Sequence, residues 1–199
     1  MKKALSFRLT LSIISLLLFI GKTHSQTLNK PINSFLGVKF GSTQQIVINL
    51  AKVKKGIYAK STSSSNTLSY TNMKFASKPT FRVAFTFFEN KLYEGRVFFK
   101  VDQQQNALEE YNKILADLND VYGASGSHER EFKYPYEEGG KDEWIAIANN
   151  YATISDTWID NTIPSAVKLF IMENGELICL WYQHLDLQDK AVAKRQIDY

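Results

Sequence analysis

Residues 81–100, "FRVAFTFFENKLYEGRVFFK", decide the fold class, because outside the central turn their odd positions are almost all apolar. The even positions mix apolar and charged residues, and alternation with a period of two predicts two antiparallel strands with one apolar face. A three-residue loop at 90–92 would place Phe87 opposite Gly95, so that an aromatic ring covers the gap left by the glycine. We therefore expect the aromatic residues here to build the core of a sheet, not an exposed binding platform.

A second hairpin is predicted at residues 164–185, "PSAVKLFIMENGELICLWYQHL". Asn174-Gly175 between alternating strands is a strong hairpin signal, and a two-residue turn there places Met172 opposite Leu177. Both faces of this hairpin are apolar. It is therefore either covered on both sides, for example by a helix, or it shows one apolar face to a partner. The face in question carries Phe170, Met172, Leu177 and Trp181.

Two amphipathic helices are predicted to pack against the hairpins. The first covers residues 42–55, with Ser42 or Thr43 as its N-cap. The second runs from about residue 104 to 122, and Gly123 follows it as a C-cap glycine. Their apolar faces are expected to hold Ile46, Val47, Leu50 and Val53 in the first helix and Leu108, Tyr111, Leu115, Leu118 and Tyr122 in the second.

The other segments carry weaker signals. Residues 143–158, "EWIAIANNYATISDTW", are predicted to form a third hairpin that turns at Asn149-Asn150. Residues 124–142 contain three glycines and a proline and are predicted to be irregular, with the charged run "HERE" at 128–131 as a solvated loop. The expected fold class is therefore α+β, with antiparallel hairpins packed against two helices.

A helix followed by the pattern V-x-F-x-F-x-E-N at 83–90 recurs as a helix followed by V-x-L-x-I-x-E-N at 167–174. This repetition indicates a single domain over residues 26–199 that contains two related units, 34–102 and 103–187. Convergence of two hairpins on similar turns explains the likeness equally well.

Residues 1–25 have the pattern of a secretory signal peptide: a basic start, an apolar run over 9–20 and a small residue, Ser25, before the predicted cut. The apolar run is shorter than the roughly 20 residues that span a bilayer. We expect cleavage after Ser25, a secreted or periplasmic protein, and no transmembrane segment in the mature chain. An uncleaved N-terminal anchor is the alternative.

Cleavage would remove four of the 24 basic residues and no acidic residue, which leaves 20 of each sign. A chain without net charge lacks the basic excess that nucleic-acid binding requires, so no nucleic-acid partner is expected. Cys179 is the only cysteine, so no intramolecular disulfide can form. In the middle of an apolar strand it is predicted to be a small buried residue.

Residues 35–50, "FLGVKFGSTQQIVINL", place a glycine and Ser/Thr before an amphipathic helix that a sheet follows. This arrangement resembles the exported BamE-like and β-lactamase-inhibitor-protein-like modules. Residues 68–99 and the segment "YNKILADLNDVYG" at 111–123 are similar to small secreted proteins of Bacteroidetes-type bacteria. Such modules generally present a sheet to another protein, so the resemblance implies a protein partner.

The sequence contains no complete catalytic motif. His184 and Asp186 lie two residues apart after the last predicted strand and could form half of a dyad, but no G-x-S-x-G motif supplies a nucleophile. The "HERE" run lacks the second histidine of a zinc helix, and there is no phosphate-binding loop. We expect no cofactor and no metal.

The leading hypothesis is an exported, non-enzymatic module that binds another protein through Phe170, Met172, Leu177 and Trp181. The alternative is a secreted hydrolase or small-ligand-binding protein that uses His184, Asp186 and the 124–142 loop.

Overall fold

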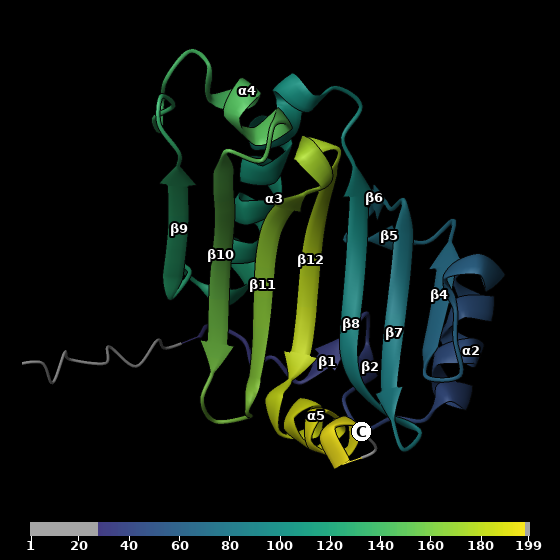
Figure 1. Ribbon diagram of the computed structural model, residues 1–199. Coiled ribbons are helices and arrows are strands. Elements are labelled where there is room, and N and C mark those ends of the chain that lie inside the picture. The colour runs from purple at the N-terminus through teal and green to yellow at the C-terminus, as the bar shows by residue number, and fades with distance from the viewer. Residues whose placement is uncertain (1–27, 198–199) are drawn as a thin grey trace, which may run out of the picture.

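The computed structural model describes residues 28–197, which adopt the predicted α+β fold around one large antiparallel sheet (Figure 1). The predicted signal peptide and its cleavage site lie outside the described residues. The strands are β1 (Ser34–Phe35), β2 (Val38–Lys39), β3 (Ile57–Tyr58), β4 (Thr67–Thr71), β5 (Lys74–Phe75), β6 (Lys78–Pro79), β7 (Arg82–Phe88), β8 (Lys91–Lys100), β9 (Ser127–Phe132), β10 (Ala152–Asp160), β11 (Ser165–Met172) and β12 (Leu177–His184). The α-helices are α2 (Gln44–Val53), α3 (Ala107–Tyr122), α4 (Glu143–Ala148) and α5 (Leu185–Ile197), and the 3-10 helices are η2 (Lys60–Thr62), η3 (Gln104–Asn106) and η4 (Glu173–Gly175).

Within residues 28–197, eight strands form the main sheet in the order β3-β4-β7-β8-β12-β11-β10-β9. Each half of the sheet follows one helix in the chain: α2 precedes β3, β4, β7 and β8, and α3 precedes β9 to β12. The halves meet where β8 pairs with β12. Two short hairpins, β1-β2 and β5-β6, stand apart from this sheet. The division of the chain into two units and its origin by duplication stay predictions.

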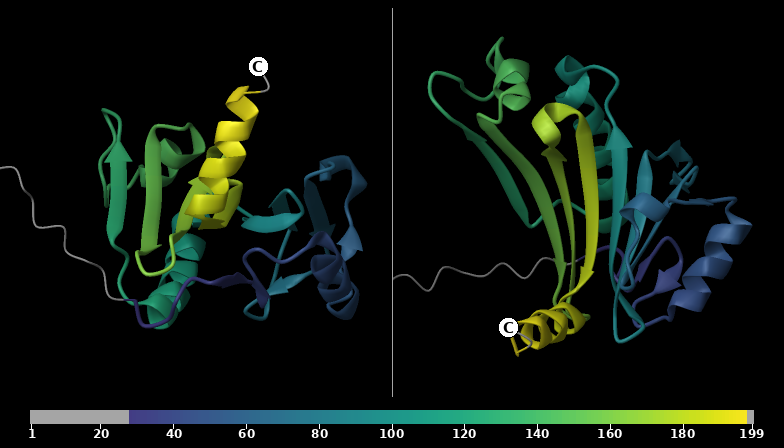
Figure 2. Two further views of the ribbon diagram at one scale, coloured as in Figure 1. Left: turned by 90° about the horizontal axis from the view of Figure 1, so that it is seen from below. Right: turned by 45° about the vertical axis from the view of Figure 1, so that its right-hand side comes forward.

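The helices lie on opposite faces of the sheet. Figure 2 shows α2, α3 and the N-terminal segment on one face, and α5 projecting from one end of the other. Tyr111, Ile114 and Leu118 of α3 are buried in the main core, together with residues of both halves of the sheet. One continuous core therefore joins the two halves.

The first helix is present, but it buries a narrower stripe than predicted. Val47 and Ala51 are almost fully buried, whereas Ile46 and Val53 are 49% and 82% exposed. The predicted N-cap residue, Thr43, has an extended backbone but makes no side-chain cap hydrogen bond. Instead, the side-chain oxygen of Asn90, in the turn of the first hairpin, accepts a hydrogen bond from the backbone N–H of Gln44 at 3.0 Å. Asn90 lies far along the chain, so the local sequence pattern does not reveal this cap.

The first hairpin has most of its predicted core face but a different register, and Phe81, expected in the core, is 50% exposed. Val83 pairs with Val97, and Phe85 rather than Phe87 pairs with Gly95. The loop has two residues instead of three, and a bulge between Thr86 and Phe87 absorbs the difference. A shift by two residues leaves the side chains up to the bulge on their predicted faces, because side chains alternate with a period of two. Beyond the bulge the parity changes, so that Leu92 joins the main core in place of Tyr93.

The second hairpin has the predicted register throughout, with Met172 opposite Leu177 and Phe170 opposite Cys179. Cys179 is buried as predicted, at 1% exposure. Burial raises the pKa of its thiol to about 12, so the thiol stays protonated and unreactive at neutral pH.

The prediction of a third hairpin is wrong in its first strand. Residues Glu143–Ala148 form helix α4, in which Ala146 and Ile147 are buried. The strand that pairs with β10 is β9, which contains the "HERE" run predicted to be a loop. Its alternating polar side chains find partners on β10, so that a polar segment becomes an edge strand. Helix α5 was not predicted, because its sequence shows no clear amphipathic pattern.

Phe35 packs over Gly95 at the centre of the core. A Cβ atom on Gly95 would lie 2.1 Å from the Phe35 ring, so no larger residue fits there without movement. Phe85 and Tyr182, which pair with Gly95 from the strands on either side, flank the ring at centroid distances of 5.1 and 5.3 Å. The predicted aromatic cover over this glycine exists, but it comes from β1 and not from Phe87.

We predict that Gly95→Ala lowers the free energy of unfolding by about 1–3 kcal/mol, because the methyl group forces the Phe35 ring out of its position. Urea unfolding followed by circular dichroism measures the change. The double variant Gly95→Ala/Phe35→Leu should lose less stability than the two single variants added together, since the two residues touch. Simple additivity would contradict this packing.

Candidate functional site

The face of the sheet opposite α3, here called the front face, carries the predicted partner-binding residues. Arg82, Phe98, Cys179 and Phe170 form one cross-strand row on β7, β8, β12 and β11. In Figure 1 this face points toward the reader, and α5 crosses only its lower end. No helix among residues 28–197 covers its centre.

An apolar cluster occupies the centre of the front face. Phe98, Leu177 and Cys179 are buried, and Phe170, Met172 and Trp181 pack against them as partly exposed residues. The Phe170 and Trp181 rings meet edge to face at 6.5 Å. Of the predicted residues, Phe170, Met172 and Trp181 thus reach the surface, whereas Leu177 is buried in the cluster against which they pack.

Two arginines cover the aromatic rings of this cluster. The guanidinium carbon of Arg82 lies 4.2 Å from the centre of the Phe98 ring, and that of Arg96 lies 4.5 Å from the centre of the Trp181 ring. Such cation–π contacts stabilise each pair and orient the guanidinium groups. Both arginines stand at even positions of the first hairpin, but their place above the rings was not predicted, because it depends on the observed register of this hairpin and on its pairing with β12.

A groove of about 470 Å³ lies beside the cluster, between the sheet and α5. Arg82, Arg96 and Arg195 line it, against a single carboxylate, that of Glu94. Glu94 forms an ion pair with Arg96 at 3.1 Å. The Nε atom of Arg82 and the Nε1 atom of Trp181 are buried and have no hydrogen-bond partner among the described residues. The groove therefore offers an excess of positive charge.

The structure does not join His184 and Asp186 into a dyad. His184 ends β12, where its ring meets Phe40 at 5.7 Å, and its buried Nδ1 atom has no partner among the described residues. Asp186 lies in the first turn of α5 and makes no hydrogen bond or ion pair with His184. Strands β10 and β11 separate β12 from β9, so the structure keeps His184 apart from most of the 124–142 segment.

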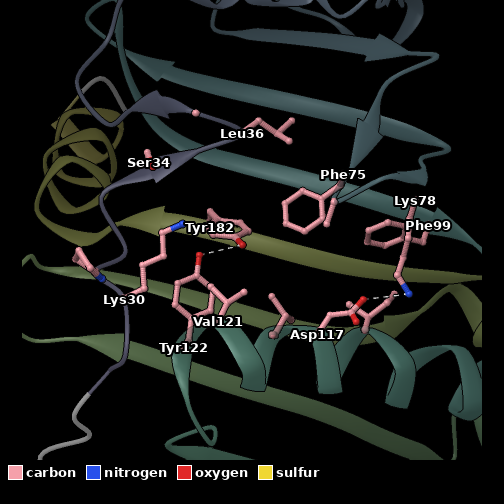
Figure 3. A pocket seen from close by; sticks show the side chains of 15 residues that line it. Lys30, Ser34, Leu36, Phe75, Lys78, Phe99, Asp117, Val121, Tyr122 and Tyr182 are labelled. Carbon is pink, nitrogen blue, oxygen red and sulfur yellow. Dashed lines mark hydrogen bonds and ion pairs between the residues drawn. The ribbon is translucent and has the colours of Figure 1, made fainter.

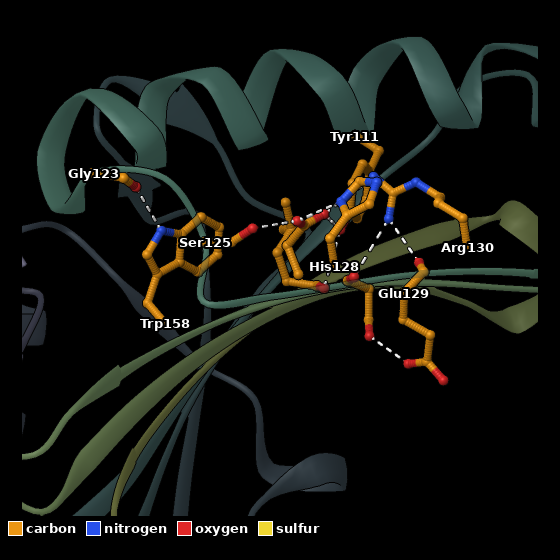
Figure 4. A network of polar contacts seen from close by, with 10 residues as sticks. Tyr111, Gly123, Ser125, His128, Glu129, Arg130 and Trp158 are labelled. Atoms are coloured by element: carbon orange, nitrogen blue, oxygen red, sulfur yellow. Dashed lines mark hydrogen bonds and ion pairs between the residues drawn. The ribbon is translucent and has the colours of Figure 1, made fainter. Parts of the chain in front are cut away.

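A buried carboxylate, Asp156, organises that segment instead (Figure 4). It is 1% exposed and accepts hydrogen bonds from Tyr111 at 2.6 Å, Ser125 at 2.7 Å and Arg130 at 3.1 Å. His128 Nδ1 lies 2.8 Å from the same carboxylate. Burial alone would raise the pKa of Asp156, but these hydrogen bonds outweigh it and lower the pKa.

The order of groups in this network differs from that of a catalytic triad. In a triad the histidine stands between the nucleophile and the carboxylate. Here Asp156 stands between Ser125 and His128, and the hydroxyl of Ser125 donates its hydrogen bond to the carboxylate and not to the histidine. The network joins α3 to the edge strand β9. Sequence reasoning missed it because the run that contains His128 and Arg130 was interpreted as a loop.

Comparison with known proteins identifies no relative: no protein-family model, no curated protein and no solved structure matches this chain. The resemblance to BamE-like and inhibitor-like modules therefore stays a prediction. Within residues 28–197, no helix is both long and apolar enough to cross a membrane. The same residues contain no group of three or more His, Cys, Asp or Glu side chains placed to hold a metal ion.

We predict that Asp156→Asn lowers the free energy of unfolding at pH 7 by about 2–3 kcal/mol, the value of charge-assisted hydrogen bonds. Because the pKa of Asp156 is lowered in the folded state, its contribution is present above the unfolded value of about 3.9. The contribution is lost as the pH falls through the folded pKa. The variant should therefore differ less from the wild type in acid, which urea unfolding at several pH values measures.

Asp120→Asn is the matched control, because Asp120 is an exposed residue on α3. We expect this change to alter stability by no more than about 0.5 kcal/mol at any pH. An equal effect of the two substitutions would mean that the Asp156 network does not stabilise the fold.

Proposed function

We propose that this protein is an exported, non-enzymatic module that binds another protein through its front face. The observation that carries this proposal is the uncovered apolar cluster around Phe170, Met172 and Trp181, next to the groove. Partly exposed aromatic and Met side chains beside arginine are enriched where proteins bind each other. The pattern of residues 1–25 supports the export part of the proposal.

The chemistry of the groove supports a partner segment that carries acidic and apolar side chains together. Three guanidinium groups face one carboxylate in the groove, so an Asp or Glu of the partner would meet an excess of positive charge. An adjacent apolar or aromatic side chain would meet Phe170 and Met172. Arginine and tryptophan are also the residues that most often contribute large shares of binding energy at the centre of an interface.

The position of Trp181 makes it the expected anchor. Its ring lies between Phe170 and Arg96 and adjoins both the cluster and the groove. A partner that covers this ring would exclude water from the cation–π pair and strengthen it.

The proposal is tested with peptides selected from a random display library on the wild-type protein. We expect the selected peptides to contain Asp or Glu beside aromatic or aliphatic residues, and to bind more weakly as salt rises. Trp181→Ala and Arg195→Glu should each weaken binding by about tenfold or more in a calorimetric titration, a loss of roughly 1.4 kcal/mol.

Lys133→Glu serves as the control, since this exposed lysine follows β9 at the opposite edge of the sheet. It should bind the selected peptides like the wild type. Circular dichroism must show that Trp181→Ala keeps its fold. Failure to select any peptide, or equal binding by all three variants, would count against the front face as a binding surface.

A further inference from the structure

A second cavity lies on the other side of the sheet, between α3 and the tips of the two short hairpins (Figure 3). It has a volume of about 240 Å³ and is here called the hairpin pocket. Its walls are mainly apolar and come from at least five parts of the chain. They include Leu36 of the β1-β2 turn, Phe75 of β5, Phe99 of β8, Leu118 and Val121 of α3, and Tyr182 of β12.

The backbone at the rim of the pocket is unfavourable for the residues found there. Both hairpins have two-residue turns with left-handed backbone, which Asn and Gly adopt most easily. Leu36 has a φ of 51° and Ala76 a φ of 45°, yet neither is Asn or Gly. Both residues line the pocket. Residues held in uncommon conformations cluster at ligand sites, so this rim is a first indication of binding.

A hydroxyl hydrogen inside the pocket lacks an acceptor. Tyr122 and Tyr182 are 7% and 3% exposed, and their hydroxyl oxygens lie 3.3 Å apart. This single hydrogen bond uses one of the two hydroxyl hydrogens, and neither oxygen has another partner among the described residues. Burial raises the pKa of both hydroxyls, so both stay protonated. The pair can therefore donate one hydrogen bond to a ligand atom.

The two lysines of the pocket differ in their surroundings. Lys78 forms an ion pair with Asp117 at 3.2 Å, which compensates its charge. Lys30 makes no ion pair or hydrogen bond among residues 28–197. Figure 3 shows Lys30 at the end of the pocket near Tyr122 and Tyr182, and the Lys78–Asp117 pair at the other end. The end that holds the free hydroxyl hydrogen thus also holds an uncompensated positive charge.

We infer that the hairpin pocket binds a small carboxylic acid, with its carboxylate at Lys30 and the tyrosine pair and its apolar body between Phe75, Phe99 and Leu118. A cavity of 150 Å³ accommodates benzene. The volume of the hairpin pocket, about 240 Å³, therefore suits a ligand of about ten non-hydrogen atoms. This site is separate from the front face, and the inference does not depend on the proposed function.

Phenylacetate is a suitable probe, and 2-phenylethanol is its uncharged counterpart. Titrations followed by NMR should show saturable shifts of the Tyr122, Tyr182 and Phe75 ring signals with phenylacetate at millimolar concentration. Lys30→Met should weaken phenylacetate binding about tenfold and leave the weaker binding of 2-phenylethanol unchanged. Absence of phenylacetate binding would overturn the inference, and equal affinity of wild type and Lys30→Met would overturn the carboxylate assignment.

Two equally exposed valines, one inside the pocket and one outside it, provide a matched test of whether the ligand binds in the pocket. Val121 lines the pocket and is 39% exposed, whereas Val192 of α5 is 38% exposed and lies outside it. Val121→Trp should abolish binding of both probes by filling the cavity, and Val192→Trp should not change it. Retained binding in Val121→Trp would contradict the site. The double variant Tyr122→Phe/Tyr182→Phe removes both hydroxyls with little change in shape. Weaker phenylacetate binding by this variant supports the site, and unchanged binding contradicts it.

Discussion

The contact of Phe35 with Gly95 is the constraint on which the rest of the structure depends. β8 and β12 join the two halves of the sheet, and the absent side chain of Gly95 leaves a gap in the helix-side core at this junction. The Phe35 ring fills the gap from the N-terminal segment. The same segment is held on the second half by Asp160, whose Oδ2 atom accepts a hydrogen bond from the Ile32 backbone N–H at 3.0 Å. One short piece of chain thereby ties both halves together.

This arrangement makes the two faces of the sheet unequal. On the helix side, the N-terminal segment, α2 and α3 cover the apolar side chains, and the space left between α3 and the hairpin tips is the hairpin pocket. On the front face, α5 is the only helix among residues 28–197 that approaches. Arg82 and Arg96 therefore cover the rings of Phe98 and Trp181, and Phe170 packs against Trp181. The proposed protein-binding surface and the inferred ligand pocket are thus consequences of the same packing, on opposite sides.

The sequence predicted those elements whose signals are local. Asn174-Gly175 between two regularly alternating strands specified both the turn and the complete register of the second hairpin. The first hairpin lacks such a turn: Glu89 and Asn90 both adopt left-handed backbone, and the added bulge could not be inferred from alternation. Helix α4 was predicted to be a strand because "EWIAIA" alternates like one, and strand β9 was predicted to be a loop because "HERE" is polar. Their partners, which decide between these states, lie elsewhere in the chain.

By itself, the sequence determined the α+β class, the two long hairpins and their faces, α3 with its buried stripe, and the burial of Cys179, because periodicity and turn chemistry act over a few residues. Of the candidate binding residues, it identified Trp181 and Phe170 but not the arginines above the cluster. Only the tertiary structure decided which face of the second hairpin stays uncovered, where Asp156 finds its donors, and that Leu36, Tyr122 and Tyr182 enclose one pocket. These features depend on contacts between residues far apart in the chain, and such contacts leave no periodic signal in the sequence.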